Sequence, residues 1–187
     1  RFPKSLREIE FFTNDTDLQV NILESDPPSI QRFFSWCEEV IPGFSSGDSI
    51  DYRVGEDVFR VTNRSFFQVN RFLVEDLVRE AVGGASGAAA LDLFAGVGLF
   101  TLPLARAFER VVAVDTSRGA SGDLRHNLER AGARARVVNL NVANYLTEAG
   151  QAPDFVIADP PRSGLGAAVT RELVRLQAAR LALVSCD

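Results

Sequence analysis

The sequence predicts an α/β fold, in which a doubly wound and mostly parallel sheet follows a small α+β unit. Three observations predict this fold: a series of short apolar segments, helical segments that alternate with them after Arg71, and a glycine turn after the first apolar segment. The apolar segments are residues 89–94, 111–115, 135–140, 155–158 and 181–185. Strands that alternate with helices in this way form parallel sheets covered by helices on both faces.

The N-terminal region has a different periodicity, and we expect it to form a small mixed domain over residues 1–62, ahead of the sheet domain at 63–187. Turn residues at Asn14 and Gly55 separate paired strands, and Pro28 marks the start of a helix. The expected elements are strands at 9–12 and 18–23, a helix from Pro28 to about residue 41, and a hairpin at 50–54 and 58–61.

Length and composition fit one globular domain with a small appendage, because the chain has 187 residues, of which 46% are hydrophobic and 24% charged. No run of eighteen apolar residues and no signal peptide is present, so we expect a cytoplasmic protein without membrane contact. We also expect a monomer. Cys37 and Cys186 have no C-x-x-C partner, which argues against a metal centre. The net charge of −5 argues against a nonspecific nucleic-acid binder.

The chain contains no methionine, and it ends directly after an apolar strand. We therefore expect a fragment whose sheet continues in C-terminal strands that are missing here.

A glycine turn follows the first strand of the expected sheet. Asp92 lies within that strand, Gly96 and Gly98 form the turn, and Asp115 closes the next apolar segment. Glycines let backbone amides approach a ligand, and a carboxylate after the second strand accepts hydrogen bonds from ribose hydroxyls. Dinucleotide enzymes carry a third glycine where this chain has Thr101, so the turn favours a cofactor without a pyrophosphate. S-adenosylmethionine fits, with its amino acid end against Asp92 and the turn amides.

Polar side chains stand at or just past the ends of the strands. They are Asp92, Asp115, Asn141, Asp159 and Cys186. Because ligands of parallel sheets bind beyond the carboxyl ends of the strands, we expect these side chains to converge on one ligand-binding edge.

Four motifs in this order resemble the RNA uracil-5-methyltransferases, the family that makes 5-methyluridine in transfer and ribosomal RNA. The motifs are Phe66-Phe67-Gln68-Val69-Asn70, the turn at 91–98, Asp159-Pro160-Pro161-Arg162-Ser163-Gly164 and Val184-Ser185-Cys186-Asp187. The resemblance covers roughly residues 60–187 closely and the small unit before them more loosely. It implies a Rossmann-like class I methyltransferase fold and an RNA substrate, tRNA or rRNA.

The resemblance also implies roles for individual residues. Cys186 would be the nucleophile, and S-adenosylmethionine contacts would come from Gln68, Phe94, Asp115, Asn141 and Asp159. This chain departs from the family at Leu99, where some members have Asn. It also lacks the family's N-terminal RNA-binding barrel and cysteine cluster, and the downstream segment that carries a glutamate base.

The chemistry explains these residue types, because carbon 5 of uracil is too weak a nucleophile to accept a methyl group directly. A cysteine thiolate that adds to carbon 6 activates carbon 5. Asp159 or Gln68 could stabilise the developing enolate by hydrogen bonds to the uracil edge. Phe66 or Phe67 could stack on the base, and Arg162 could hold a phosphate or the base.

Several alternatives stay open from the sequence alone. Read alone, Cys186 fits a buried core thiol, and Asp159 could simply cap a turn. Asp115 could be the N-cap of the next helix, and Phe66 and Phe67 could serve packing alone. The same cofactor turn also occurs in amino-group and cytosine-5 methyltransferases, and a non-catalytic cofactor-binding RNA scaffold would need no general base.

Overall fold

The computed structural model describes residues 6–25, 31–42, 44, 49–68 and 70–185. Its centre is a parallel sheet in the strand order β7-β6-β5-β8-β9. The strands are β5 (Gly87–Leu93), β6 (Phe108–Asp115), β7 (Arg136–Asn139), β8 (Phe155–Ala158) and β9 (Arg180–Leu183). The predicted α/β class with a doubly wound parallel sheet is confirmed, and all five expected strands are present.

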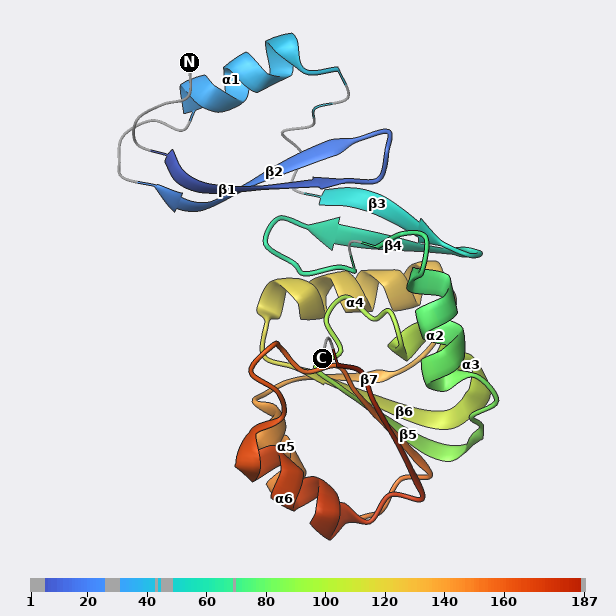
Figure 1. Ribbon diagram of the computed structural model, residues 1–187. Helices are drawn as coiled ribbons and strands as arrows, with labels where there is room; N and C mark the ends of the chain where they lie inside the picture. Colours follow the sequence, from blue (N-terminus) through green and yellow to red (C-terminus); the bar gives the residue numbers. More distant parts are fainter. Residues whose placement is uncertain (1–5, 26–30, 43, 45–48, 69, 186–187) are drawn as a thin grey trace.

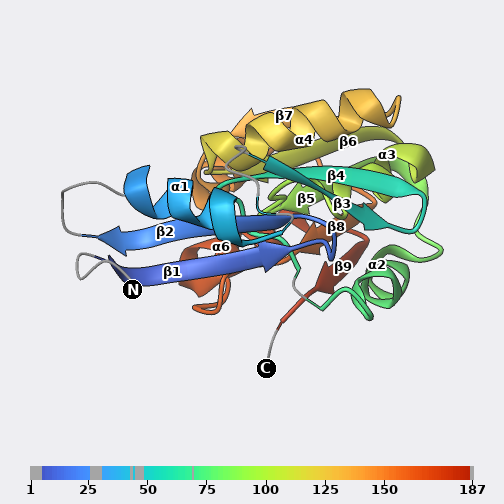
Figure 2. The ribbon, with the colours of Figure 1, turned by 90° about the horizontal axis from the view of Figure 1, so that it is seen from above.

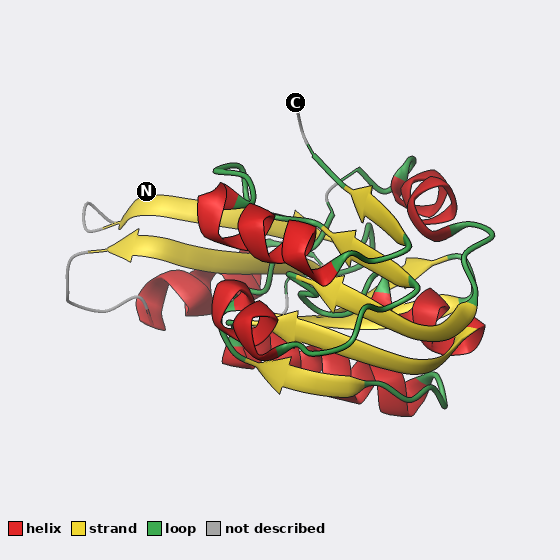
Figure 3. Cartoon of the chain, turned by 90° about the horizontal axis from the view of Figure 1, so that it is seen from below, coloured by secondary structure: helices red, strands yellow, loops and turns green. Residues whose placement is uncertain are grey.

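Helices cover both faces of this sheet, as Figure 1 shows. On one side lie α2 (Val74–Val82), α3 (Thr101–Ala107) and α4 (Arg118–Arg130); on the other lie α5 (Val142–Glu148) and α6 (Gly166–Leu176). Figure 3 shows the sheet from the α5 and α6 side. Consecutive strand residues point to opposite faces. Ala113 accordingly packs in the core beneath α4, and Val114 in the core beneath α5 and α6.

The N-terminal unit packs around a small core of its own. Strands β1 (Leu6–Thr13) and β2 (Leu18–Ser25) form an antiparallel pair, and helix α1 (Gln31–Val40) lies beside them (Figure 2). Val20, Phe33 and Cys37 are buried together between these elements. Cys37 is therefore a core thiol.

A second antiparallel pair, β3 (Ser49–Val54) and β4 (Asp57–Thr62), lies between the N-terminal unit and α4 (Figure 1). Its Tyr52, Phe59 and Val61 belong to the same apolar core as the buried residues of α4. The sequence pattern assigned this hairpin to the N-terminal unit, whereas its buried face packs with the sheet domain. None of the helices in the described part of the chain is long and apolar enough to cross a membrane.

Candidate cofactor and active site

The strand order creates a ligand-binding edge between β5 and β8. The chain leaves β5 toward β6 and β7 and then returns to β8 on the other side of β5, which makes this a topological switch point. Backbone hydrogen bonds hold the loops there: Ala95 N donates to Val114 O at 3.1 Å, and Asp159 N donates to Leu93 O at 3.3 Å. The glycine turn and the Asp-Pro-Pro loop therefore flank one edge, as the sequence predicts.

The two turn glycines serve different purposes. Gly96 has a φ of 54°, and a Cβ added to it would meet nothing within 4 Å. Gly98 has a φ of 101°, and a Cβ there would lie 2.3 Å from Leu124 Cδ1. Gly98 thus permits the close packing of α4, whereas Gly96 borders open space that a ligand can enter.

Phe94 precedes this turn in the left-handed region, with a φ of 61°, although it is not a glycine. Its ring packs against the core beneath α5 and α6. A strained aromatic residue is held there only because its surroundings fix it, and such positions cluster at functional sites.

Asp115 closes the turn from the neighbouring strand. Its Oδ2 accepts a hydrogen bond from Gly96 N at 2.8 Å, and its Oδ1 accepts one from Ser117 N at 2.7 Å. The N-cap of α4 is Ser117, which accepts from Ala120 N, so the alternative of Asp115 as the cap is wrong. Each carboxylate oxygen keeps a second lone pair for a ribose hydroxyl.

Asp92 lies beneath the turn and is fully buried. Thr101 Oγ1 donates to its Oδ2 at 2.5 Å, while its Oδ1 has no hydrogen-bond partner among the described residues. Burial raises the pKa of Asp92 to about 7, and the nearby charges of Asp159 and Asp115 act in the same direction. A contact between Asp92 and the cofactor stays a prediction, and the Oδ1 atom is the one that has no partner among the described residues.

Sequence reasoning interpreted Thr101 only as a missing glycine. Its hydroxyl is the single hydrogen-bond donor to the buried Asp92 carboxyl within the described chain. The signal for this hydrogen bond is a hydroxyl residue that stands nine residues after an acidic residue in a buried strand.

Two predicted motifs meet in space at the open side of the edge. Gln68 Nε2 donates to Asp159 Oδ2 at 3.2 Å. Partial burial raises the pKa of Asp159, and the hydrogen bond from Gln68 opposes that rise because it stabilises the ionised form. The carboxylate is thus desolvated, oriented and still accessible, which suits it to binding a polar edge of a base or an ammonium group.

The neighbouring phenylalanines separate into two roles. Phe67 is only 4% exposed and packs against Tyr52 and Phe59, with ring centroids 4.8 and 5.5 Å apart. It is a core residue, which corrects its assignment as a stacking residue. Phe66 is 71% exposed and leaves its ring free to stack.

The remaining predicted site residues are Asn141, Arg162 and Cys186, and the structure describes the first two. Asn141 is the N-cap of α5, where its Oδ1 accepts from Ala143 N at 2.9 Å. Its position after β7 puts it at the predicted edge, and its side-chain amide stays available for a ligand. Arg162 is exposed in the loop after β8. Cys186 lies outside the described residues, so its role stays a prediction from its motif.

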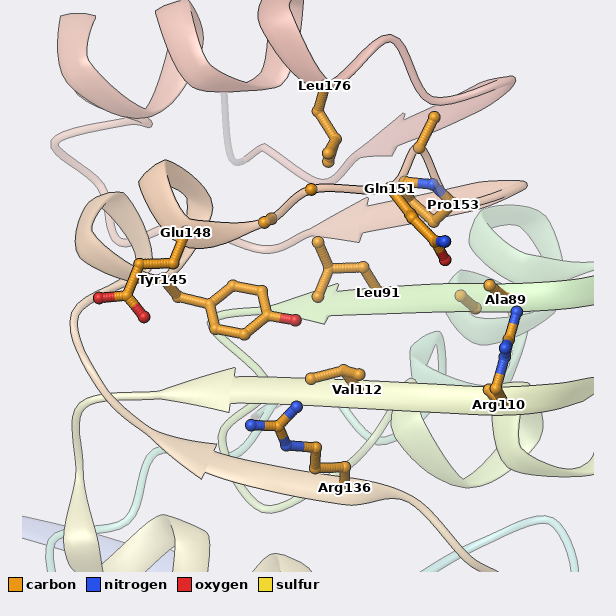
Figure 4. A pocket seen from close by; sticks show the side chains of 14 residues that line it. Ala89, Leu91, Arg110, Val112, Arg136, Tyr145, Glu148, Gln151, Pro153 and Leu176 are labelled. Atoms are coloured by element: carbon orange, nitrogen blue, oxygen red, sulfur yellow. The ribbon is translucent and has the colours of Figure 1, made fainter.

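A pocket of about 470 Å³ lies elsewhere, on the sheet face that also carries α5 and α6 (Figure 4). Its lining includes Ala89, Arg110 and Arg136, which stand near the amino ends of their strands. None of the predicted site residues lines it. Hence this pocket is separate from the ligand-binding edge.

The family described as "Conserved hypothetical protein 95" matches residues 73–180, more than half of the chain. An uncharacterized RNA methyltransferase of Streptomyces avermitilis is 36% identical over 136 residues, which cover 69% of this chain and 31% of that protein. The 23S rRNA (uracil(1939)-C(5))-methyltransferase RlmD of Pseudomonas aeruginosa is 36% identical over 162 residues, covering 78% of this chain and 32% of its own length. The chain thus spans about a third of the length of these relatives.

A similar solved structure is the tRNA (uracil-54, C5)-methyltransferase of Pyrococcus abyssi in complex with S-adenosyl-L-homocysteine. It superimposes with a TM-score of 0.70 at 24% identity, covering 91% of this chain and 47% of its own. The likeness confirms the predicted class I fold. The chain therefore belongs to the family described as "Conserved hypothetical protein 95".

Proposed function

We propose that this chain is the cofactor-binding part of an enzyme that methylates carbon 5 of a uridine in tRNA or rRNA. The observation that carries the proposal is the hydrogen bond between Gln68 and Asp159, because it joins two separate motifs of the uracil-5-methyltransferases at the ligand-binding edge. Two relatives support the same acceptor, since the names of both specify carbon 5 of uracil.

The residues at the edge fit S-adenosylmethionine. Gly96 leaves open space in which the adenosine could lie, and Asp115 offers lone pairs to the ribose hydroxyls. Phe94 and Asn141 border the same edge from the ends of β5 and β7. When bound, the cofactor supplies an electrophilic methyl group on a positively charged sulfur.

The chain's own contribution to the reaction begins with a thiolate. Cys186 would add to carbon 6 of uracil, which forms a carbon–sulfur bond and makes carbon 5 nucleophilic. S-adenosylmethionine, held by residues such as Asp115 and Asn141, would supply the methyl group to carbon 5 and would leave as the neutral thioether. A base removes the proton of carbon 5, and the electron pair of that bond expels the Cys186 thiolate.

Side chains of the predicted motifs would position the uracil ring. The exposed ring of Phe66 suits stacking on a uracil that has left its own stack. Asp159 and Gln68 would hydrogen-bond the polar edge of the base or the cofactor, and Arg162 would hold a phosphate. The resemblance to the family implies that a glutamate would receive the proton of carbon 5.

RNA that carries 5-fluorouridine at the target position tests the proposal, because fluorine cannot be removed as a proton and the covalent adduct persists. The full-length protein should give a protein–RNA adduct on a denaturing gel that requires S-adenosylmethionine. Cys186→Ala should abolish the adduct, while Cys37→Ala should retain it, since Cys37 is buried in the N-terminal core. Methyl transfer to RNA that survives Cys186→Ala would point instead to an amino-group acceptor.

A further inference from the structure

Helix α4 carries buried polar side chains on the face that meets hairpin β3–β4. Asp123 and Asn127 are both 0% exposed, although α4 is otherwise amphipathic. They stand four residues apart and therefore share one face of the helix. Buried polar groups persist when they satisfy other buried polar groups, so their partners indicate what they hold.

Asn127 joins the hairpin to the glycine turn. Its Oδ1 accepts from Arg60 N at 2.7 Å, and its Nδ2 donates to Arg60 O at 3.2 Å and to Val97 O at 3.0 Å. Val97 lies between Gly96 and Gly98. One side-chain amide therefore fixes both the backbone of β4 and the backbone of the cofactor turn.

Asp123 holds the segment that leads to Gln68. Its Oδ2 accepts from Thr62 N at 2.9 Å, from Thr62 Oγ1 at 2.9 Å and from Ser65 Oγ at 3.0 Å. Its Oδ1 pairs with Arg60 Nε at 2.8 Å. A backbone hydrogen bond from Ser65 N to Thr62 O closes the turn, and Gln68 follows three residues later.

We propose that Asp123 and Asn127 are positioning residues, which set the separation between two backbone segments, here called the walls of the cofactor groove, without touching the cofactor. Asn127 fixes one wall, the turn at Val97, and Asp123 fixes the other, the segment from Thr62 to Gln68. Because both side chains project from adjacent turns of α4, this helix connects the two walls. Hairpin β3–β4 thereby becomes part of the cofactor site.

This inference concerns the cofactor groove and does not depend on which base is methylated. If the network is purely structural, disrupting it would lower stability alone. If it positions the groove, disrupting it would lower cofactor affinity in protein that remains folded. Variants of similar stability in the full-length protein distinguish these two roles of the network. Dissociation constants for S-adenosylhomocysteine are measured by calorimetry, well below each variant's melting temperature.

Asn127→Asp keeps the oxygen that accepts from Arg60 N and replaces the donor that faces Val97 O. It should raise the dissociation constant about tenfold or more, since orphaned buried carbonyls disturb the turn. Leu176→Ala is the control, because Leu176 is buried at the far end of α6. It should lower the melting temperature and change the dissociation constant less than about twofold. Equal dissociation constants for the two variants would overturn the role of Asn127.

Thr62 provides a milder pair, in case Asn127→Asp does not fold. Thr62→Val removes the hydroxyl that bonds to Asp123 and to Ser65 Oγ, and Thr62→Ser keeps it. The Val variant should bind S-adenosylhomocysteine several-fold more weakly than wild type, and the Ser variant should bind as wild type does. If Val and Ser variants bind alike, Asp123 does not position the groove.

Discussion

Gln68 and Asp159 are 91 residues apart in the sequence, yet Gln68 Nε2 donates to Asp159 Oδ2 at 3.2 Å. The contact brings the segment before α2 against the loop after β8. It also affects the pKa of Asp159, because the hydrogen bond from Gln68 opposes the desolvation that raises this pKa.

Gln68→Ala should raise the pKa of Asp159 further, since the ionised carboxylate loses its donor while desolvation remains. If ionised Asp159 is needed, the acidic limb of the pH–rate profile for methyl transfer should move to higher pH. Gln151→Ala, at an exposed glutamine that lines the separate pocket, should leave the profile unchanged. An unshifted acidic limb in Gln68→Ala would show that Asp159 does not act in its ionised form.

Asp92 should make folding stability depend on pH. Its pKa is about 7 in the folded protein against an ordinary value of 3.8, so the folded state binds the proton more tightly. The contribution of Asp92 to stability is therefore complete below about pH 4, falls as the pH rises toward about 7, and is level above it.

Asp92→Asn removes this titration. Relative to wild type, the variant should become progressively more stable between pH 4 and pH 7, by roughly 1.4 kcal/mol for each unit of pKa shift. Urea unfolding of both proteins across this range gives the difference. A difference that does not change with pH would mean that Asp92 titrates as it does in the unfolded chain.

Asp115→Ala should weaken binding of S-adenosylhomocysteine by about 1–3 kcal/mol, because ribose hydroxyls and Gly96 N lose their acceptor. Asp154→Ala is a matched control. Asp154 also accepts from two backbone amides, Ala88 N and Ala89 N, but at the amino end of the same sheet. It should cost stability and leave the affinity measured by calorimetry intact. Similar losses of affinity in both variants would remove the ribose role of Asp115.

The two turn glycines should respond differently to alanine. Gly98→Ala forces a methyl group against Leu124 and should cost about 1–3 kcal/mol of stability. Gly96→Ala meets no protein atom and should cost less, yet its methyl group would enter the groove and weaken cofactor binding more. Thermal unfolding and calorimetry on both variants check this. The idea of Gly96 as the ligand-facing glycine fails if its variant binds normally.

Local patterns in the sequence determined the strands, the parallel sheet and its ligand-binding edge. Apolar runs such as residues 155–158 are long enough only for buried strands, and the helical segments between them force parallel pairing. The ends of parallel strands meet at one edge, so the order of the strands and helices is enough to place Asp115 and Asp159 there. These features depend on residues close in sequence or on topology.

Tertiary structure alone decided the directions of individual side chains. Phe66 and Phe67 are neighbours of the same type, yet one is exposed and the other lies in the core, because Tyr52 and Phe59 of the hairpin occupy only one side of their loop. No local signal separates them, since a loop has no fixed periodicity to assign its side chains to faces.

The same physical reason explains why the directions of the Asp92 and Asn127 side chains could not be predicted. Whether a polar side chain faces solvent, a ligand or another buried group depends on which distant groups lack a partner. Thr101 and Val97 O supply those partners here. The sequence alone therefore determined the fold and the place of the predicted cofactor edge, and tertiary packing decided which buried groups Asp92 and Asn127 contact.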